Sequence, residues 1–149
     1  MKESPTDEEV LAAFPRLPIN EDNVEHYRGR LQRRLLLNRC GSCGHWHNPP
    51  RPVCPRCWSA EVRPEQVSGR GVIDLLTVLH IGSAVPDVDY EAGYPLAAIA
   101  LVEQPGLRFT ASITEVGSGG IRIGMPVELA WAEREGAPLP VFRPAQVTA

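Results

Sequence analysis

The sequence predicts a mainly β protein in which short helices precede a small metal-binding ribbon and a five-stranded barrel. Three observations support this prediction. Helix signals are confined to the first 34 residues, all four cysteines fall in two C-x-x-C pairs between residues 40 and 57, and five strand-like segments follow residue 69. The chain of 149 residues is long enough for one domain with a small appendage, and its 15 Pro and 13 Gly indicate many turns.

Two short helices are predicted near the N-terminus. Thr6 and Glu9 have the spacing of a capping box, which begins a helix that continues to about Ala13. Asn20 is the expected cap of a second helix over about residues 21–33, which a glycine at position 29 weakens. Residues 1–34 are therefore expected to form a helical segment.

This helical segment carries apolar side chains for which the sequence offers no obvious core. Helices this short are unstable alone, so we expect these side chains to become ordered against a partner subunit. The side chains are those of Leu11, Phe14, Leu17, Ile19 and Tyr27.

The four cysteines, Cys40, Cys43, Cys54 and Cys57, predict one structural Zn²⁺ site. Each C-x-x-C pair forms a tight turn in which both thiolates point the same way, and the intervening residues can form a hairpin that unites the pairs. Disulfides are disfavoured in a cytoplasmic chain, and a redox C-x-x-C would need a βαβ context that the sequence lacks. Four thiolates leave no open coordination position, so the metal would be structural, with iron as the alternative ion.

Residues around the cysteines complete the predicted ribbon, which is expected to span residues 35–66. His45 and His47 lie between the two pairs, and either could replace a cysteine as a ligand. Trp46 and Trp58 are expected to cover the ribbon, because so small a metal unit has almost no core of its own.

The remaining region, residues 67–149, predicts five strands separated by Gly- and Pro-containing turns. A small closed barrel of the OB type accommodates five strands in about 75 residues and avoids exposed sheet edges. An open five-stranded sandwich is the alternative fold. The expected strands cover residues 72–80, 95–103, 107–116, 126–133 and 141–145.

Charge is distributed unevenly along the chain. Residues 28–70 hold nine Arg against two acidic residues, whereas both flanks are acidic. This basic segment could face phosphate groups or an acidic protein surface, or it could pair with the acidic flanks of the same chain. The sequence holds no apolar run long enough to span a membrane and no secretory signal, so a cytoplasmic location is the default expectation.

An ordered set of short motifs resembles the zinc-ribbon plus OB-fold family of acyl-CoA-associated proteins. The resemblance runs from about residue 20 to residue 146. The motifs are RLLLNRC at 34–40, NPPRPVCPRC at 48–57, SGRG at 68–71, RIGMPVELAW at 122–131 and LPVFRPA at 139–145. The family resemblance implies a rubredoxin-like ribbon and an OB barrel.

The same resemblance implies a partner enzyme that holds the catalytic residues. In that family the partner is a thiolase-fold enzyme of the sterol-carrier-protein type, or a hot-dog-fold enoyl-CoA hydratase. The chain would then be a non-catalytic subunit of an aldolase or thiolase in steroid side-chain or related lipid degradation, in a two-plus-two assembly with acyl-CoA near the interface. Candidate contacts for CoA or the partner are Arg28, Arg30, Arg33, Arg34, Arg51 and Arg56.

Two other function classes compete with this interpretation. The chain could have its own acid–base site, for which the candidates are Asp74, His80, Asp87 and Asp89. It could also bind nucleic acid, as other zinc ribbons and OB barrels do. The barrel strands disfavour nucleic acid, because residues 71–149 hold four Arg against nine acidic residues and few aromatic side chains.

Overall fold

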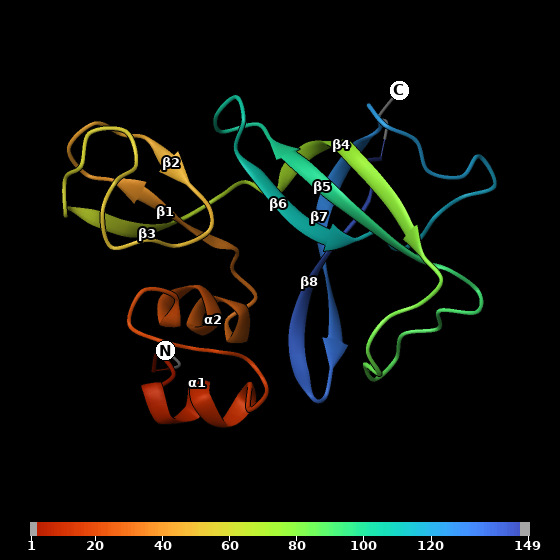
Figure 1. The fold of residues 1–149 in the computed structure, drawn as a ribbon, viewed down its shortest axis with the longest axis horizontal. Helices are drawn as coiled ribbons and strands as arrows, with labels where there is room; N and C mark the ends of the chain where they lie inside the picture. Colours follow the sequence, from red (N-terminus) through yellow and green to blue (C-terminus); the bar gives the residue numbers. More distant parts are fainter. Residues whose placement is uncertain (1–2, 147–149) are drawn as a thin grey trace. The chain divides into compact units, whose positions relative to one another are not determined.

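The computed structural model describes residues 3–146, which form two compact units (Figure 1). Unit 1 comprises residues 3–67 and Gly136–Pro138, and unit 2 comprises residues 68–135 and 139–146. The described residues form two helices, a three-stranded sheet and a five-stranded sheet. This confirms the mainly β fold class. The finer division of the chain at residues 34 and 66 stays a prediction.

Helix α1 (Asp7–Ala13) begins at the predicted capping box. The Thr6 hydroxyl accepts a hydrogen bond from the Glu9 backbone N–H (3.3 Å), and the Glu9 carboxylate accepts one from the Thr6 N–H (2.7 Å). These two bonds satisfy donors that the first helical turn leaves unpaired. Local sequence therefore determines where this helix begins.

Helix α2 (Val24–Leu31) is shorter than the predicted segment 21–33. The Asn20 side chain accepts a hydrogen bond from the Asp22 N–H (2.9 Å), so Asn20 forms a turn instead of capping the helix. The helix begins only after Asn23, whose own side chain bonds the Asn20 N–H and the Pro18 carbonyl. Local side-chain bonds thus delay the helix by three residues.

The C-terminal end of α2 is a Schellman motif. Arg33 adopts a left-handed φ of 55°, and its N–H donates to the Arg30 carbonyl (3.0 Å). The Arg34 N–H donates to the Gly29 carbonyl (2.8 Å), which completes the motif. The chain therefore leaves the helix before residue 33 and turns toward the ribbon.

The helices of unit 1 pack around a small apolar cluster centred on Val10, Phe14 and Ala137. Ile19 and Tyr27 also pack against this cluster, so the expectation that Phe14, Ile19 and Tyr27 lack a core in this chain was wrong. The missing element is Ala137, which is distant in sequence and invisible to any local pattern. The other two residues of the predicted set, Leu11 and Leu17, remain exposed.

The ribbon sheet has the strand order β2-β1-β3 and is antiparallel throughout. Strand β1 (Leu36–Cys40) lies in the middle, between β2 (Trp46–His47) and β3 (Val62–Gln66). Three consecutive leucines, residues 35–37, are buried where β1 begins. Strand β1 therefore links the apolar part of unit 1 to the first cysteine.

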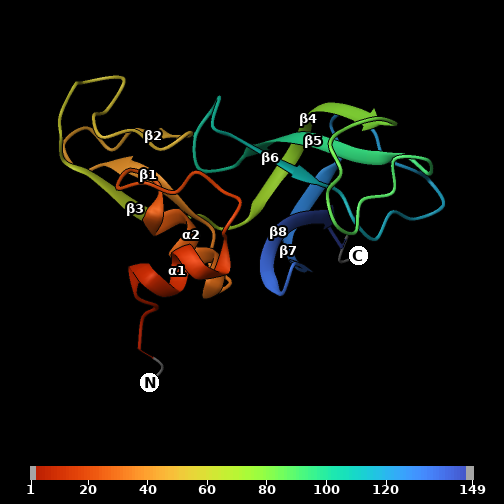
Figure 2. The same ribbon diagram turned by 60° about the horizontal axis from the view of Figure 1, so that its bottom comes forward.

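The predicted five strands form one sheet in the order β6-β5-β4-β7-β8, and all of it except the start of β8 belongs to unit 2 (Figures 1 and 2). A parallel bridge between Ile113 and Phe142 joins the two ends of this order, and the Thr114 N–H donates to the Phe142 carbonyl (2.8 Å). This closure gives the OB type of barrel in place of an open sandwich. The strands are β4 (Arg70–Leu79), β5 (Tyr94–Leu101), β6 (Arg108–Ser112), β7 (Pro126–Arg134) and β8 (Ala137–Pro144).

The two largest errors in the predicted strand boundaries are the end of β6, predicted at residue 116, and the start of β8, predicted at residue 141. Strand β6 ends at Ser112, because the next residue leaves its pairing with β5 for the bridge to Phe142. Strand β8 begins at Ala137, because Glu135 and Gly136 (φ 52° and 79°) form a tight hairpin turn after β7.

No helix among residues 3–146 is long and apolar enough to cross a membrane.

Replacing Gly29 with Ala tests the close approach of α2 to β1. A Cβ at Gly29 would lie 2.7 Å from Leu36 Cγ and 2.8 Å from the Arg34 carbonyl oxygen. Alanine favours a helix over glycine by about 1 kcal/mol, but overpacking costs about 1–3 kcal/mol. We expect Gly29→Ala to unfold at lower urea concentration, whereas Gly119→Ala, with open space around it, should stay within about 0.5 kcal/mol of wild type. A higher urea midpoint for Gly29→Ala than for wild type would contradict the close packing of α2 against β1.

His26 predicts an acid sensitivity of unit 1. Burial lowers its pKa below the ordinary value and nearby Arg30 adds to the effect, although the hydrogen bond between Nδ1 and the Leu36 carbonyl (2.9 Å) opposes it. The unfolded chain therefore takes up the proton first, and stability present above about pH 6.5 is lost as the pH falls. We expect the stability difference between wild type and His26→Gln to shrink from pH 7.5 to pH 5.5, by at most about 1.4 kcal/mol per pH unit. A stability difference that stays constant over this pH range would contradict the burial of the imidazole.

Candidate metal centre

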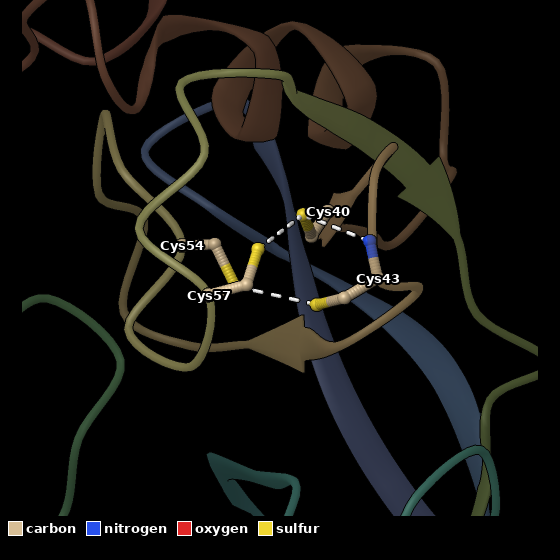
Figure 3. Close-up of side chains that lie close together, drawn as sticks. All are labelled: Cys40, Cys43, Cys54 and Cys57. Carbon is tan, nitrogen blue, oxygen red and sulfur yellow. Dashed lines mark hydrogen bonds between the residues drawn. The ribbon is translucent and has the colours of Figure 1, made fainter.

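The Sγ atoms of the four cysteines all lie within 4.8 Å of one another (Figure 3). The Cys40 and Cys57 sulfurs are 3.5 Å apart, and the Cys43 and Cys54 sulfurs are 3.7 Å apart. Four sulfurs placed tetrahedrally at about 2.3 Å from Zn²⁺ would be about 3.8 Å apart, whereas a disulfide is about 2.05 Å long. The spacing therefore fits a metal cage and not a pair of disulfides.

The first cysteine of each pair organises the turn around it. Cys40 Sγ accepts a hydrogen bond from the Ser42 N–H, and Cys54 Sγ accepts one from the Arg56 N–H, both at 3.4 Å. These hydrogen bonds hold the backbone of each turn close to its first sulfur. Each N–H donor also stabilises a negative charge on that sulfur. The two C-x-x-C segments are thus built alike.

Both turns end in the left-handed backbone conformation. The Cys40 carbonyl accepts from the Gly44 N–H, and the Cys54 carbonyl accepts from the Trp58 N–H, both at 3.0 Å. Gly44 has φ 77° and Trp58 has φ 66°. Glycine adopts this conformation without penalty, but a tryptophan does so at a conformational cost.

The protein environment of the sulfurs favours a bound cation. The N–H of Cys43 lowers the pKa of Cys40 to about 6. At Cys54, burial raises the pKa, but the N–H groups of Cys57 and Arg56 outweigh it and the pKa is lowered. At Cys57, a hydrogen bond from the Ser59 backbone lowers the pKa, but the neighbouring thiols and burial outweigh it and raise the pKa to about 12. Four thiolates this close need a positive charge among them, and Zn²⁺ supplies two.

The tryptophans of the ribbon differ from each other. Trp46 is only 7% exposed and lies beneath the Arg39 guanidinium, 5.0 Å from the ring centroid, so it covers the ribbon as predicted. Trp58 is 82% exposed, so its predicted covering role was wrong. Trp58 ends the second turn in the left-handed conformation, with φ 66°, and its indole is exposed to solvent. The sequence did hold a signal, because Trp58 follows its C-x-x-C pair as Gly44 follows the other.

The two ribbon histidines lie outside the group of four sulfurs. His47 is buried, and burial lowers its pKa, although the Arg51 backbone opposes the effect. A neutral imidazole in this position fills space in the ribbon. The arrangement therefore favours four cysteines as the ligands over a set that includes His45 or His47.

Two of the six candidate arginines, Arg28 and Arg30, contact acidic or aromatic side chains of unit 1. Arg28 forms ion pairs with Asp7 and Glu25. The Arg30 guanidinium lies over the Phe14 ring, 4.8 Å from its centroid, and also over the Tyr27 ring. The positive charges of Arg28 and Arg30 are therefore used within this chain, as one of the three interpretations of the basic segment expected.

The other four candidate arginines have exposed side chains, namely Arg33, Arg34, Arg51 and Arg56. Arg34 Nε donates to the Gln66 side chain (3.0 Å), and Arg33 forms the left-handed end of α2. Arg51 and Arg56 lie in the loop between β2 and β3, and no ion pair or side-chain hydrogen bond holds either guanidinium within residues 3–146.

The residues considered for acid–base catalysis are Asp74, His80, Asp87 and Asp89. Asp74 forms an ion pair with Arg108 (2.6 Å). The Asp89 carboxylate accepts the Glu91 N–H (2.9 Å) and shapes the loop that contains it. The other two side chains, His80 and Asp87, are exposed.

Within the described part of the chain, the four cysteines are the one group of at least three His, Cys, Asp or Glu side chains close enough to share a metal.

Two family descriptions match consecutive parts of the chain. Residues 28–63 match the description "ChsH2, rubredoxin-like zinc ribbon domain". Residues 64–132 match "ChsH2, C-terminal OB-fold domain". Together the two matches cover the ribbon and most of the barrel.

Two curated relatives are similar in sequence. A "Probable enoyl-CoA hydratase alpha subunit" of Thermomonospora curvata is 35% identical over 145 residues, which are 97% of this chain but 44% of that protein. The chain thus spans less than half the length of this relative. A "DUF35 domain-containing scaffold protein" of Pyrococcus furiosus is 34% identical over 104 residues, which are 70% of this chain and 71% of that protein.

Two solved structures are similar in fold. A chain of the "Ltp2-ChsH2(DUF35) aldolase" has a TM-score of 0.76 and 35% identity, covering 87% of this chain and 98% of that one. A protein of unknown function from the DUF35 family of Sulfolobus solfataricus has a TM-score of 0.59 and 12% identity, covering 93% and 96%. The second likeness shows the fold alone.

Removing one thiol should release the metal. We expect wild-type protein purified without added metal to hold about one zinc per chain by elemental analysis. Cys40→Ser should lose it and lose the circular-dichroism signal of the ribbon, because metal binding and folding are coupled in such units. His45→Gln is the control and should keep its zinc. Metal-free wild type, or loss of metal from His45→Gln, would contradict the four-cysteine site.

Proposed function

Because the chain belongs to the ChsH2 family of zinc-ribbon and OB-fold proteins, we propose that it is the non-catalytic subunit of a thiolase-fold acyl-CoA enzyme. Family membership confirms the resemblance found in the sequence. The observation that supports the proposal most is the likeness to nearly the whole of one chain of the Ltp2-ChsH2(DUF35) aldolase. The proposed assembly contains two copies of this chain and two of the enzyme.

The proposed reaction is cleavage of a carbon–carbon bond in a bulky acyl-CoA, by a retro-aldol or thiolytic route, with a steroid side chain as the substrate. The catalytic residues would belong to the partner. In this chain, Cys40, Cys43, Cys54 and Cys57 would hold Zn²⁺, which would stabilise the ribbon. A cage of four thiolates has no open position at which water or substrate could bind the metal.

The barrel would complete the substrate tunnel of the enzyme through the loop of residues 81–94. Ile81 in this loop is 86% exposed, which provides apolar surface for a hydrophobic substrate or tunnel wall. The Tyr90 hydroxyl donates to the Ser83 carbonyl (3.0 Å), and the Asp89 carboxylate accepts the Glu91 N–H. These bonds hold the loop in shape, so it could exclude water from a tunnel.

The basic segment offers contacts for the phosphates of CoA. Arg33 and Arg34 present exposed guanidinium groups, which bind phosphate well, and Arg51 and Arg56 are exposed on the ribbon loop. Arg28 and Arg30 are committed to contacts within unit 1 and are weaker candidates. The competing assignment is that the exposed arginines pair with acidic residues of the partner.

A subunit of an enoyl-CoA hydratase is the second candidate. It is favoured by the similarity to the Thermomonospora curvata protein, which extends over 97% of this chain. More than half of that protein lies outside the match, so its hydratase activity need not reside in the shared part. Hydration of an enoyl-CoA by the assembled complex would support this alternative over bond cleavage.

Co-expression with the neighbouring genes tests the proposed function. We expect the chain to co-purify with an acyl-CoA enzyme, and we expect that enzyme to lose solubility or activity when the chain is omitted. Size measurement of the complex checks the two-plus-two stoichiometry. Turnover of any acyl-CoA by this chain alone would contradict the non-catalytic role, and full activity of the isolated partner would contradict the need for this subunit.

Replacing both Arg33 and Arg34 with Ala tests the CoA contact. If these side chains bind CoA phosphates, the apparent KM of the complex for acyl-CoA should rise about tenfold with little change in kcat, because charge-assisted hydrogen bonds to substrate are lost. Arg122→Ala, an exposed arginine of unit 2, is the matched control and should leave KM unchanged. Failure of the complex to assemble would assign the two arginines to the protein interface.

A further inference from the structure

Trp58 occupies a position that neither folding nor metal binding explains. It is 82% exposed and holds a left-handed φ of 66°. The first C-x-x-C turn satisfies the same geometry with Gly44, at φ 77°. Glycine at position 58 would therefore suffice for the turn, and it would avoid both the backbone strain and the exposed indole.

Trp58 lies within an apolar surface that is bordered by positive charge. A hollow of about 390 Å³ is lined by Arg51, Pro52, Val53, Cys54, Pro55 and Trp58. The exposed residues of this region are Arg51, Pro52, Val53, Pro55, Arg56 and Trp58, which we call the Trp58 surface. Val53 is 40% exposed, so the surface offers apolar area in addition to the indole. The surface belongs entirely to the loop between β2 and β3, residues 48–61 (Figures 1 and 2, yellow).

The charge of this loop determines what could bind it. Residues 44–60 contain Arg51 and Arg56 but no Asp or Glu. The two guanidinium groups have no ion pair or side-chain hydrogen bond within residues 3–146, so both side chains are available to an acidic ligand. A complementary ligand must bring negative charge together with apolar surface for the indole.

A protein surface satisfies this requirement better than a phosphate-bearing cofactor does. Phosphate sites hold arginine in a fixed geometry for bidentate contact, but Arg51 and Arg56 are not fixed by any neighbour in the described chain. Trp and Arg are the residue types that dominate binding energy in protein interfaces, where an aromatic anchor enters a pocket and charges form the rim. The Trp58 surface has this composition.

We propose that Trp58 is the anchor by which this chain docks onto an acidic, apolar-centred patch of its enzyme partner. Arg51 and Arg56 form the charged rim of that contact. The inference rests on the proposed function, because it names the docking residue for the same partner. The conformational cost of a left-handed tryptophan is then offset when the indole is buried in the complex.

The substitution Trp58→Gly separates docking from folding, because the two roles predict opposite effects. The variant should hold one zinc per chain and unfold at the same or a higher temperature than wild type, since glycine relieves the strain. Its affinity for the acyl-CoA enzyme that co-purifies with wild type should fall by about 30-fold or more. Trp58→Phe should stay within about tenfold of wild type, and Val102→Ala, another exposed apolar position, should bind like wild type.

The charged rim has its own readout. Arg51→Glu should slow association with the enzyme by about tenfold at low salt, and the difference from wild type should shrink as salt is raised. Association rates from surface plasmon resonance at two salt concentrations measure both effects. Equal rates for wild type and Arg51→Glu at low salt would overturn the acidic character of the partner patch.

The outcomes distinguish the docking proposal from the proposed function. If wild type captures no acyl-CoA enzyme, the proposed function fails and the docking proposal falls with it. If wild type captures the enzyme and Trp58→Gly binds it equally well, only the docking proposal is overturned. Trp58→Gly could also keep its affinity for the enzyme but lose binding of coenzyme A or of single-stranded DNA. That result would overturn the docking proposal too and would assign the surface to the ligand whose binding is lost.

Discussion

The convergence of four sulfur atoms within 4.8 Å is the constraint on which unit 1 depends. Cys40 is the last residue of β1, the central strand of the ribbon sheet, and β2 contributes only two residues to that sheet. So small a sheet has little apolar area with which to stabilise itself. A metal that joins Cys40 to Cys57 fixes the end of β1, whose beginning is held by buried leucines at residues 35–37. A bound metal and the buried leucines would thus stabilise the same strand from opposite ends.

The sequence predicted those features that are determined by residues close together in the chain. The capping box at Thr6, the two C-x-x-C turns and the five strands of the barrel all depend on local spacing, and all are present. The core of unit 1 was missed because Ala137 joins Val10 and Phe14 from the far end of the chain. The choice of a barrel over a sandwich likewise depends on a long-range contact, the bridge from Ile113 to Phe142.

The arginines of residues 28–70 also show what local sequence can predict and what depends on long-range contacts. Counting residues gives a basic segment at 28–70 but treats every arginine as equal. The structure separates them, because Arg28 pairs with the acidic flank at Asp7 and Arg30 lies over the ring of Phe14. The exposed positive charge of unit 1 is therefore shifted toward the end of α2 and the ribbon loop. Interpretations of the basic segment as a partner or CoA surface apply to that smaller set.

The two C-x-x-C turns allow the needs of folding to be distinguished from the needs of binding within one molecule. They share the N–H donors to sulfur, the carbonyl acceptors and the left-handed final residue, yet one ends in Gly44 and the other in Trp58. Any requirement of the metal or of the backbone applies to both turns and is met by glycine. What tryptophan adds at the second turn is an exposed indole between apolar and basic neighbours. An isolated subunit gains no stability from that arrangement, whereas a subunit that completes another protein gains a contact.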